Sequence, residues 1–320
     1  MKEKSSEYVE ISTTVLKRFD KPLIFDIYVK RTATNYSKLF KKEDIIDWKR
    51  IEQYEGKGVK MLCVLRAQYE RYLFYVEQLV DRLLNSTDKF SIKEGIVVVR
   101  EMINGSLTEI MHQTKVSEHL AVQAGKTVSG CIEVMGKDTL AFAKIIGQMV
   151  NRPYIFKHSV TVSLLSILIA QKAEIESQSS LNFIGLGALL HDIGISRLDF
   201  DPEEKQTLTP EELKEMWRHP ELGKRLLDPV KSIRTEVLDI ILQHHEQPNG
   251  HGYPNGLRGG EIFLPAKIVA IADTFSAMIT KRSYRDAFTP QEALQRMKQD
   301  IGKFDRQLLR IFEKVIIVDP

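Results

Sequence analysis

The sequence predicts a mainly α-helical protein with a smaller α/β domain at its N-terminus. From Ile92 onward apolar residues recur at helical spacing with few interruptions, whereas residues 1–90 mix β-leaning apolar runs with helical spacing. The polar stretch 85–88 is a credible boundary between the two parts. A chain of 320 residues is long enough for two domains of ordinary size.

Residues 1–90 contain the predicted strands. Residues 25–29 alternate in polarity, residues 60–65 form a short β-leaning run, and the aromatic run 72–76 predicts another strand before helical spacing begins. Basic side chains at 38–50 are interspersed with acidic ones, which favours a solvated face over a nucleotide site. Because this part has no catalytic constellation, we interpret it as a sensory or regulatory domain.

The remainder of the chain is predicted to be helical. Residues 91–136 form a connector with helices at 92–111 and 116–135, and residues 137–320 form the main domain. Its expected helical segments are 138–150, 160–170, 183–190, 211–227, 230–244, 265–280, 290–297 and 304–318.

Composition narrows the partners and the compartment. A net charge of +3 from 46 basic and 43 acidic residues gives no support for binding a nucleic-acid polymer. Cys63 and Cys131 lie in apolar contexts, which indicates buried thiols in a reducing compartment. The N-terminus has no apolar core typical of a signal peptide, and the apolar run 160–170 is too short and too polar to span a bilayer. We therefore expect a cytoplasmic protein without membrane insertion.

Histidines in the second half indicate a metal site. Six of the eight histidines follow residue 150, and five of these stand where they could be ligands. Each of them alone is more often structural than a ligand. Asp273 directly follows the apolar run 268–272. An isolated carboxylate in such a helix is costly to bury unless it is paired or bound to metal. Taken together, five histidines and two aspartates near helix ends or in helices favour a metal centre; they are His158, His191, Asp192, His219, His244, His245 and Asp273.

The order of these motifs resembles that of the HD-GYP phosphodiesterases, a branch of the HD-domain metal phosphohydrolases that hydrolyses cyclic di-GMP. The resemblance covers residues 138–310. It rests on HHEQPNGHGYPNGL at 244–257, on ADTFSAM at 272–278 with RSYR at 282–285, and on GKFD at 302–305. It implies an all-helical HD-GYP bundle for this part of the chain.

The resemblance also implies two divalent transition-metal ions, commonly iron or manganese. One set of ligands would be His158, His191, Asp192 and Asp273; the other would be His219, His244 and His245, with Asp192 bridging the two. Histidine-rich shells suit such metals better than Mg²⁺. A metal-bridged hydroxide would attack the phosphorus. Asp192 and Glu246 are the expected catalytic residues, and Glu246 would orient the histidine pair from behind the ligands.

The glycine-rich loop 249–261 is expected to recognise the substrate. Tyr253 would donate a hydrogen bond to phosphate or stack on a base, and Gly252 and Pro254 would fix the backbone that presents it. Arg282 and Arg285 would meet phosphate and guanine, since a guanidinium suits both. The competing interpretations are a surface salt bridge for the arginines and a loop anchor for Tyr253.

Two positions depart from the family pattern. Many members have a glutamate four residues before the first ligand histidine, which supports a third metal, whereas this chain has Tyr154. We therefore predict two metals. The family's run His-Asp-x-Gly-Lys ends here in Ile195, and loss of a preorganised cation costs on the order of a few kcal/mol of transition-state stabilisation. Arg197, two residues later, is a candidate substitute.

The leading hypothesis is a cyclic di-GMP phosphodiesterase that releases linear pGpG, with further cleavage to GMP left open, under regulation by the N-terminal domain. The alternatives are a cyclic di-GMP receptor with intact metals and weak catalysis because of Ile195, and a phosphodiesterase of a related cyclic dinucleotide. A homodimer or a signalling-protein partner bound through the N-terminal region also stays open.

Overall fold

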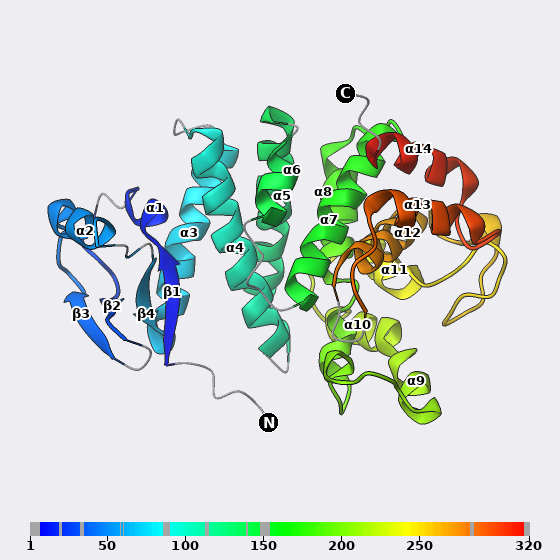
Figure 1. Ribbon diagram of the computed structural model, residues 1–320, viewed down its shortest axis with the longest axis horizontal. Coiled ribbons are helices and arrows are strands. Elements are labelled where there is room, and N and C mark those ends of the chain that lie inside the picture. The colour runs from blue at the N-terminus through cyan, green and yellow to red at the C-terminus, as the bar shows by residue number, and fades with distance from the viewer. Residues whose placement is uncertain are drawn as a thin grey trace.

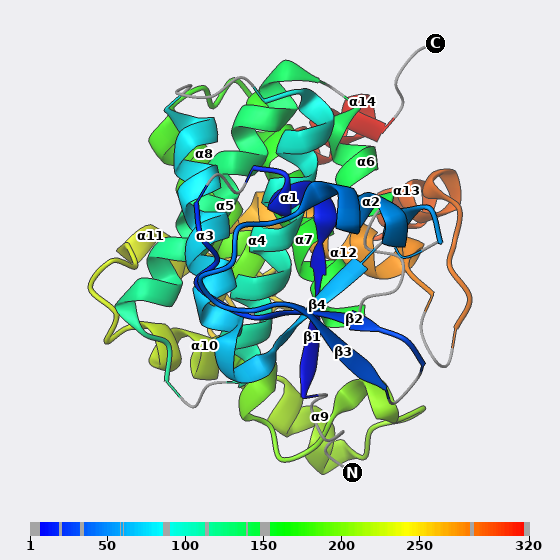
Figure 2. The same ribbon diagram turned by 90° about the vertical axis from the view of Figure 1, so that its left-hand side faces the viewer.

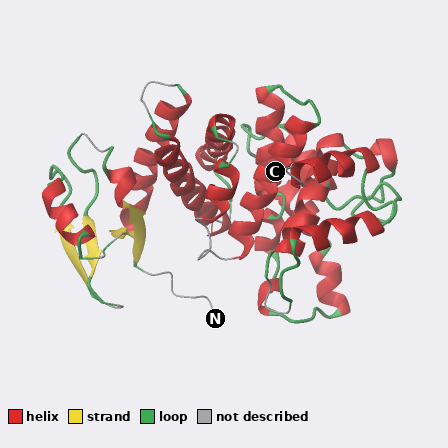
Figure 3. Ribbon diagram, turned by 45° about the horizontal axis from the view of Figure 1, so that its top comes forward, coloured by secondary structure: helices red, strands yellow, loops and turns green. Residues whose placement is uncertain are grey.

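The structure is a computed structural model that describes residues 7–18, 21–32, 35–57, 59, 61–85, 90–112, 115–138, 140–147, 154–281 and 285–316. Helices dominate it, and the strands are confined to one end of the molecule (Figures 1 and 3). The prediction of a mainly helical protein with a small N-terminal sheet domain is therefore confirmed.

The N-terminal sheet has four strands in the order β1-β4-β2-β3, and every neighbouring pair is antiparallel. Their bounds are β1 Tyr8–Ser12, β2 Ile27–Lys30, β3 Tyr36–Phe40 and β4 Met61–Leu65. The runs predicted at 25–29 and 60–65 correspond to β2 and β4, while β1 and β3 were not predicted. The short helices α1 Thr13–Leu16 and α2 Trp48–Glu55 accompany the sheet.

The strand predicted at 72–76 is wrong. These residues lie in helix α3, Tyr69–Leu84, which follows the 3-10 turn η1 Arg66–Gln68. The aromatic composition suggested a strand, but burial recurs every three or four residues through the segment, as at Tyr72, Val76, Leu79 and Leu83. The basic stretch behaves as expected, since Lys41, Lys42, Lys49 and Arg50 are exposed.

The remaining helices build the body of the protein. They are α4 Ile92–His112, α5 Glu118–Lys137, α6 Ala141–Gly147, α7 Tyr154–Lys172, α8 Gln178–Leu190, α9 Pro210–Met216, α10 His219–Leu227, α11 Thr235–Gln243, α12 Leu264–Ile279, α13 Pro290–Gln299 and α14 Arg306–Ile316, with 3-10 turns η2 Ile193–Arg197, η3 Pro202–Glu204 and η4 Gly259–Glu261. The expected segment 211–227 is thus two helices, and the second begins at His219-Pro220, where proline suits the first turn.

Two hydrophobic cores meet along α4. Val97, Val98 and Met102 belong to the core beneath the sheet, whereas Val99 and Ile103 belong to the core of the helical body. Viewed from the sheet side, the strands stand in front of α3 and α4 (Figure 2). Cys63 and Cys131 are buried free thiols, as expected.

Helix α7 is the central helix of the body and packs against α8 and α12. It is the one described helix that is long and apolar enough, by length and composition alone, to cross a membrane, because it extends beyond the run 160–170 at both ends. In this protein 67% of that window is buried inside the fold, as in the core helix of a soluble protein.

Candidate metal centre and substrate site

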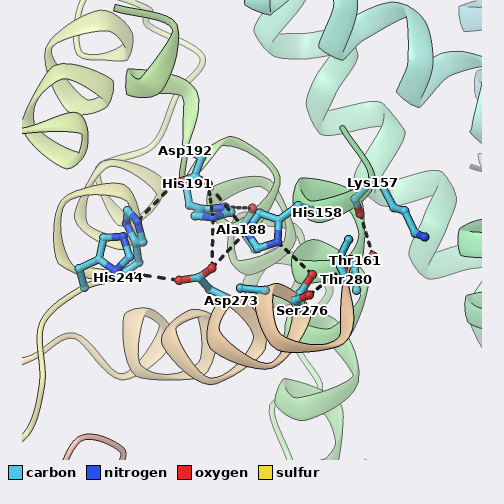
Figure 4. A network of polar contacts seen from close by, with 12 residues as sticks. Lys157, His158, Thr161, Ala188, His191, Asp192, His244, Asp273, Ser276 and Thr280 are labelled. Atoms are coloured by element: carbon cyan, nitrogen blue, oxygen red, sulfur yellow. Dashed lines mark hydrogen bonds and ion pairs between the residues drawn. The ribbon is translucent and has the colours of Figure 1, made fainter. Parts of the chain in front are cut away.

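The seven predicted ligands come from five separate segments and meet in one place. His158 lies in α7, His191 and Asp192 follow α8, and His219 opens α10. His244 and His245 follow α11, and Asp273 lies in α12. Figure 4 shows the side chains of His158, His191 and Asp273 turned toward one another, with Asp192 and His244 beside them. Four of the histidines are completely or almost completely buried: His158, His191, His219 and His244.

The donor atoms fall into two neighbouring sets. One set is His158, His191 and Asp273, and the other is Asp192, His219, His244 and His245; within each, the atoms lie within 4.8 Å of one another. Asp192 Oδ2 is 3.2 Å from His191 Nε2, while Asp192 Oδ1 is 3.3 Å from His219 Nε2. One carboxylate therefore faces both sets, each with a different oxygen.

Asp273 closes the first set and approaches the second. Its Oδ1 is 3.1 Å from His158 Nε2, and its Oδ2 is 4.0 Å from His245 Nδ1. The imidazole nitrogens and carboxylate oxygens together form a donor set of the kind that binds divalent transition metals. The residues present therefore fit the two ions that the sequence motifs imply.

Backbone carbonyls orient three of the imidazoles. His191, His219 and His244 each have Nδ1 2.7 Å from the carbonyl oxygen three residues earlier, on Ala188, Met216 and Ile241 respectively. Nδ1 then carries a hydrogen, so Nε2 is the nitrogen that faces the centre and binds a cation once it is deprotonated. A carbonyl three residues back is available wherever a histidine ends or begins a helical turn.

His158 sits in mid-helix and uses a side chain instead. Its Nδ1 is 3.0 Å from Ser276 Oγ, and Ser276 is completely buried on α12, one turn beyond Asp273. The sequence analysis missed Ser276. Its spacing of three residues from Asp273 placed both on one helix face, but only the packing of α12 on α7 brings that face to His158.

The electrostatics keep the second set ready for a cation. Burial lowers the pKa of both His244 and His245 well below the usual range, so these imidazoles are neutral and have free lone pairs. Burial raises the pKa of Asp192, but His191 and His219 outweigh that effect and hold it well below the usual range. Burial likewise lowers the pKa of His191, while Asp192 raises it more strongly, to about 9.

The absence of a side chain at Gly194 allows two ligand-bearing segments to touch. A Cβ at Gly194 would lie 2.0 Å from the His219 carbonyl oxygen and 2.7 Å from Gly223 N. The backbone of η2 therefore packs directly on α10. This contact holds Asp192, just before η2, against His219 at the start of α10.

Glu246 fastens the glycine-rich loop. Its buried carboxylate accepts hydrogen bonds from the backbone N–H of Asn255 (2.7 Å) and of Leu257 (2.9 Å). The expectation that Glu246 orients the histidine pair is therefore corrected. The carbonyls and Ser276 do that for four of the ligands, and Glu246 holds the segment that carries Tyr253.

Gly252 and Tyr253 place the loop against the ligands. A Cβ at Gly252 would lie 2.3 Å from Gln247 N and 2.4 Å from Glu246 Cα, so only glycine fits there. Tyr253 N donates to the His245 carbonyl oxygen (3.2 Å), and the Tyr253–Pro254 peptide bond is cis. Burial, together with Asp273 and Asp192, raises the pKa of the Tyr253 hydroxyl, which therefore keeps its proton as a hydrogen-bond donor.

The three arginines that were predicted to contact substrate differ in what the structure shows of them. Arg285 donates to the carbonyl oxygens of Ala277 (2.6 Å) and Met278 (3.2 Å), and its guanidinium lies over the Phe288 ring. It thus caps α12, and its contact with phosphate or guanine stays a prediction. Arg282 lies outside the described residues. Arg197 ends η2, two residues beyond Ile195, so both follow directly from the Asp192 segment.

Tyr154 occupies the position where a third ligand group was considered. Its ring stacks on His158 with centroids 5.2 Å apart and an interplanar angle of 14°. A tyrosine ring at this position supplies packing for a ligand histidine in place of a carboxylate oxygen.

Comparison with known proteins agrees with this geometry. The HD domain family matches residues 146–308. A cyclic di-GMP phosphodiesterase of Pseudomonas aeruginosa is 34% identical over 182 residues, which are 56% of this chain and 44% of that protein. A 3'3'-cGAMP-specific phosphodiesterase of Vibrio cholerae is 32% identical over 164 residues, covering 50% of this chain and 34% of the relative. The chain thus spans less than half the length of these relatives.

A solved structure shares the whole fold. It is Bd1817, an HD-GYP-type protein of Bdellovibrio bacteriovorus, with a TM-score of 0.68 and 24% identity over 97% of this chain and 99% of that one. At this identity the likeness concerns the fold alone. Since the family match spans half of the chain and contains all seven clustered residues, the protein belongs to the HD domain family.

Proposed function

We propose that this chain is a metal-dependent phosphodiesterase that hydrolyses cyclic di-GMP to linear pGpG, and that GMP is a further product. The observation that carries the proposal is the position of Asp192, whose two carboxylate oxygens lie near histidines of different ligand sets. A carboxylate bridge of this kind suits a pair of metals, and paired metals serve phosphate ester cleavage. The phosphodiesterases among the relatives support the same reaction class.

Two divalent ions, Fe or Mn, held in these sets would act as Lewis acids toward the phosphate. They would also lower the pKa of a water, so that it loses a proton and can attack phosphorus. Asp192 fixes the spacing of the two sets because its two oxygens face different histidines. Asp273 adds charge on the side of His158 and His245. The carboxylates of Asp192 and Asp273 and the neutral imidazoles of His244 and His245 thus form a cradle for in-line displacement at phosphorus.

Tyr253 is the proposed phosphate or base contact of the loop. Its hydroxyl stays protonated, and its ring stacks on the ligand His245 with centroids 4.7 Å apart. Gly252 and Pro254 hold this tyrosine in place, and Glu246 holds the loop. The hydroxyl can therefore stabilise negative charge on a phosphate oxygen without first moving into position.

The test is hydrolysis by the purified full chain. Protein loaded with Fe²⁺ or Mn²⁺ is incubated with cyclic di-GMP, and pGpG is measured by chromatography. We expect pGpG with at least one of the metals and two metal ions per chain. Measurable binding without product under any metal would overturn the enzyme, and three ions per chain would contradict the inference from Tyr154.

Ile195 favours a second candidate, a cyclic di-GMP receptor with slow turnover. The family's usual lysine is absent from this turn beside the centre, where Ile195 N bonds to the Asp192 carbonyl oxygen (2.9 Å). Ile195→Lys is expected to raise kcat by about 10- to 100-fold if the missing cation limits catalysis. Ile195→Met, of similar size without charge, is the control. Equal rates for the two variants would show that Arg197 or another group already serves the phosphate.

Substrate choice is tested with the same protein. Because a relative is 3'3'-cGAMP-specific, cyclic GMP-AMP is compared with cyclic di-GMP by kcat/KM. We propose cyclic di-GMP as the better substrate. A higher kcat/KM for cyclic GMP-AMP would reassign the substrate and leave the reaction class intact.

We also propose that residues 1–90 regulate the centre or choose a signalling partner, with residues 91–136 as connector. Support comes from α4, which contacts the sheet domain and also η2, the turn directly after Asp192. Oligomeric state and partner binding through this region are tested by light scattering and by comparing turnover with and without a candidate partner.

A further inference from the structure

Trp217 exposes its indole at the edge of the candidate centre. It follows the last turn of α9, two residues before the ligand His219, and 47% of its surface is exposed. Its ring centroid lies 5.8 Å from that of Tyr253, with an interplanar angle of 32°. A large aromatic side chain left half in water beside a partly buried one is available to a ligand.

The aromatic rings form a continuous wall that leads outward from the ligands. His245 stacks on Tyr253 at 30°, Tyr253 is followed by Trp217, and the His219 ring stands edge-on to Tyr253 at 6.4 Å. Tyr253 therefore contacts the imidazoles of His245 and His219 as well as the indole. In this row, His245 is a predicted metal ligand, Tyr253 is a hydrogen-bond donor, and Trp217 is an exposed ring that can stack.

We propose that Trp217 stacks on a guanine base of the cyclic dinucleotide and so positions the scissile phosphate at the metal centre. The inference rests on the proposed function and assigns to the same site a specificity contact beyond the glycine-rich loop. In a nucleotide the ribose separates base from phosphate. A residue that stacks on the base must therefore lie further from the metal ligands than the residue that contacts the phosphate. Trp217 meets this condition, since it reaches His245 through the ring of Tyr253.

The surroundings of Trp217 favour a base over a second phosphate. The adjacent Arg218 is occupied by Glu215, with Nη1 3.0 and 2.8 Å from the two carboxylate oxygens. Leu213, one turn earlier on α9, is 41% exposed, so this helix offers apolar surface near the indole. Stacking on a π-face needs such a surface and no counter-charge.

Tryptophan fluorescence gives a direct test, because the chain has only two tryptophans. Trp48 lies in α2 of the sheet domain, so the full-length Trp48→Phe variant reports on Trp217 alone. Metal-loaded protein is mixed with cyclic di-GMP in a stopped-flow instrument, which records binding before turnover. We expect saturable quenching of Trp217, and the complementary Trp217→Phe variant, which retains Trp48, should show none.

Kinetics supplies the second readout. Trp217→Ala is expected to raise KM for cyclic di-GMP by about tenfold, whereas Trp217→Phe keeps most of the affinity because a stacking face remains. Glu211→Ala is the control on the same helix, since Glu211 is exposed at its first turn, and it should leave KM within about twofold, as for other surface substitutions. Metal content should be equal in all variants.

The outcomes separate the two proposals. Quenching together with a higher KM in Trp217→Ala supports the stacking role. Quenching without turnover in any metal supports stacking and overturns hydrolysis. Turnover with neither quenching nor a change of KM in Trp217→Ala overturns stacking and leaves hydrolysis standing. A KM that rises equally in Trp217→Ala and Glu211→Ala also overturns it, because the effect then comes from the helix and not the indole.

Discussion

At the scale of single residues, each ligand imidazole depends on what its other nitrogen contacts. Three histidines use backbone carbonyls, which no substitution can remove, but His158 relies on the Ser276 hydroxyl. Both groups are buried, and no other hydrogen bond to His158 Nδ1 is recorded among the described residues. The first set of ligands therefore has one support that can be altered by mutation.

Ser276→Ala is expected to lower metal affinity or turnover by about 10- to 100-fold, as is usual when the partner of a ligand histidine is lost. Metal content after dialysis and kcat are the measurements. Ser166→Ala is the matched control, because Ser166 is equally buried on α7 and its hydroxyl has no hydrogen-bond partner among the described residues. Equal losses in the two variants would mean that a generic packing defect, and not His158, explains the effect.

At the scale of elements, the loop after His245 is held by the Glu246 carboxylate and by the packing of Gly252. The Glu246 carboxylate satisfies the N–H groups of Asn255 and Leu257, which lie on both sides of a turn at Gly256 with φ +66°. Gly252 packs on the chain just after the histidine pair at the other end of the loop. Tyr253 is thus fixed between two tethers, which reduces the cost of ordering it when substrate binds.

Glu246→Ala is predicted to destabilise the loop by about 2 kcal/mol, because two partly buried N–H groups lose their carboxylate acceptor. Hydrogen exchange at the amides of Asn255 and Leu257 should become faster, and KM should rise more than kcat falls. Glu261→Ala is the control within the same loop, since Glu261 is exposed and bonds only to the nearby Arg258 N. Unchanged exchange in Glu246→Ala would show that the glycine contacts alone hold the loop.

A second connection between elements joins α3 to α5. Gln123 Nε2 and Lys126 Nζ donate to the two oxygens of Glu77, and His119 lies 3.7 Å away; Lys126 also reaches Asp81. Burial raises the pKa of Glu77, but the hydrogen bonds from Lys126 and Gln123 outweigh it and hold the pKa below the ordinary 4.5. The sheet domain is therefore tied to the connector by an ionised carboxylate.

This connection predicts a pH dependence of stability. Because the folded pKa of Glu77 is lowered, its contribution is present above the unfolded value near 4.5 and is lost as the pH falls through the folded pKa. Glu77→Gln should lower the free energy of unfolding by roughly 1–2 kcal/mol at pH 7, and by little near pH 3. Thermal unfolding at both pH values measures this. Glu133→Gln, from the exposed pair with Lys137, is the control, and a gap that stays constant with pH would refute the assignment.

At the scale of the whole molecule, the sequence predicted what depends on local spacing. Helical periodicity identified most of the helices after residue 92, and the motif order identified the seven clustered residues. It did not predict partners in other elements: Ser276 for His158, Trp217 beside Tyr253, and the loop amides for Glu246. Such pairings depend on how helices pack, which spacing along one helix does not specify.

The wrong prediction of a strand at 72–76 has the same origin. Residues 72–76 combine β-prone side chains with helical burial, and packing of α3 against α4 and α5 decided the outcome. The family motif also did not predict that Arg285 donates to carbonyl oxygens at the end of α12. Local composition restricts the choices, and tertiary contacts select among them.

The sharing of α4 between two cores predicts that the molecule unfolds as one unit. Met102 is completely buried in the core beneath the sheet, while Val99 and Ile103, on the same helix, are buried in the core that surrounds the metal centre. Melting α4 therefore removes packing from both parts at once. Met102→Ala should cost about 2–5 kcal/mol of unfolding free energy, since it leaves a cavity in a fully buried site.

The two tryptophans report on the two parts separately. Trp48 lies in α2 of the sheet domain and Trp217 at the edge of the metal centre, so the single-tryptophan variants Trp217→Phe and Trp48→Phe follow one part each during denaturation with urea. We expect coincident midpoints for the two signals, and an equal decrease of both when Met102→Ala is added. If Met102→Ala moves the Trp48 midpoint and leaves that of Trp217 unchanged, the sheet domain unfolds independently. In that case α4 would not carry a signal from the sheet domain to the turn after Asp192 by coupled packing.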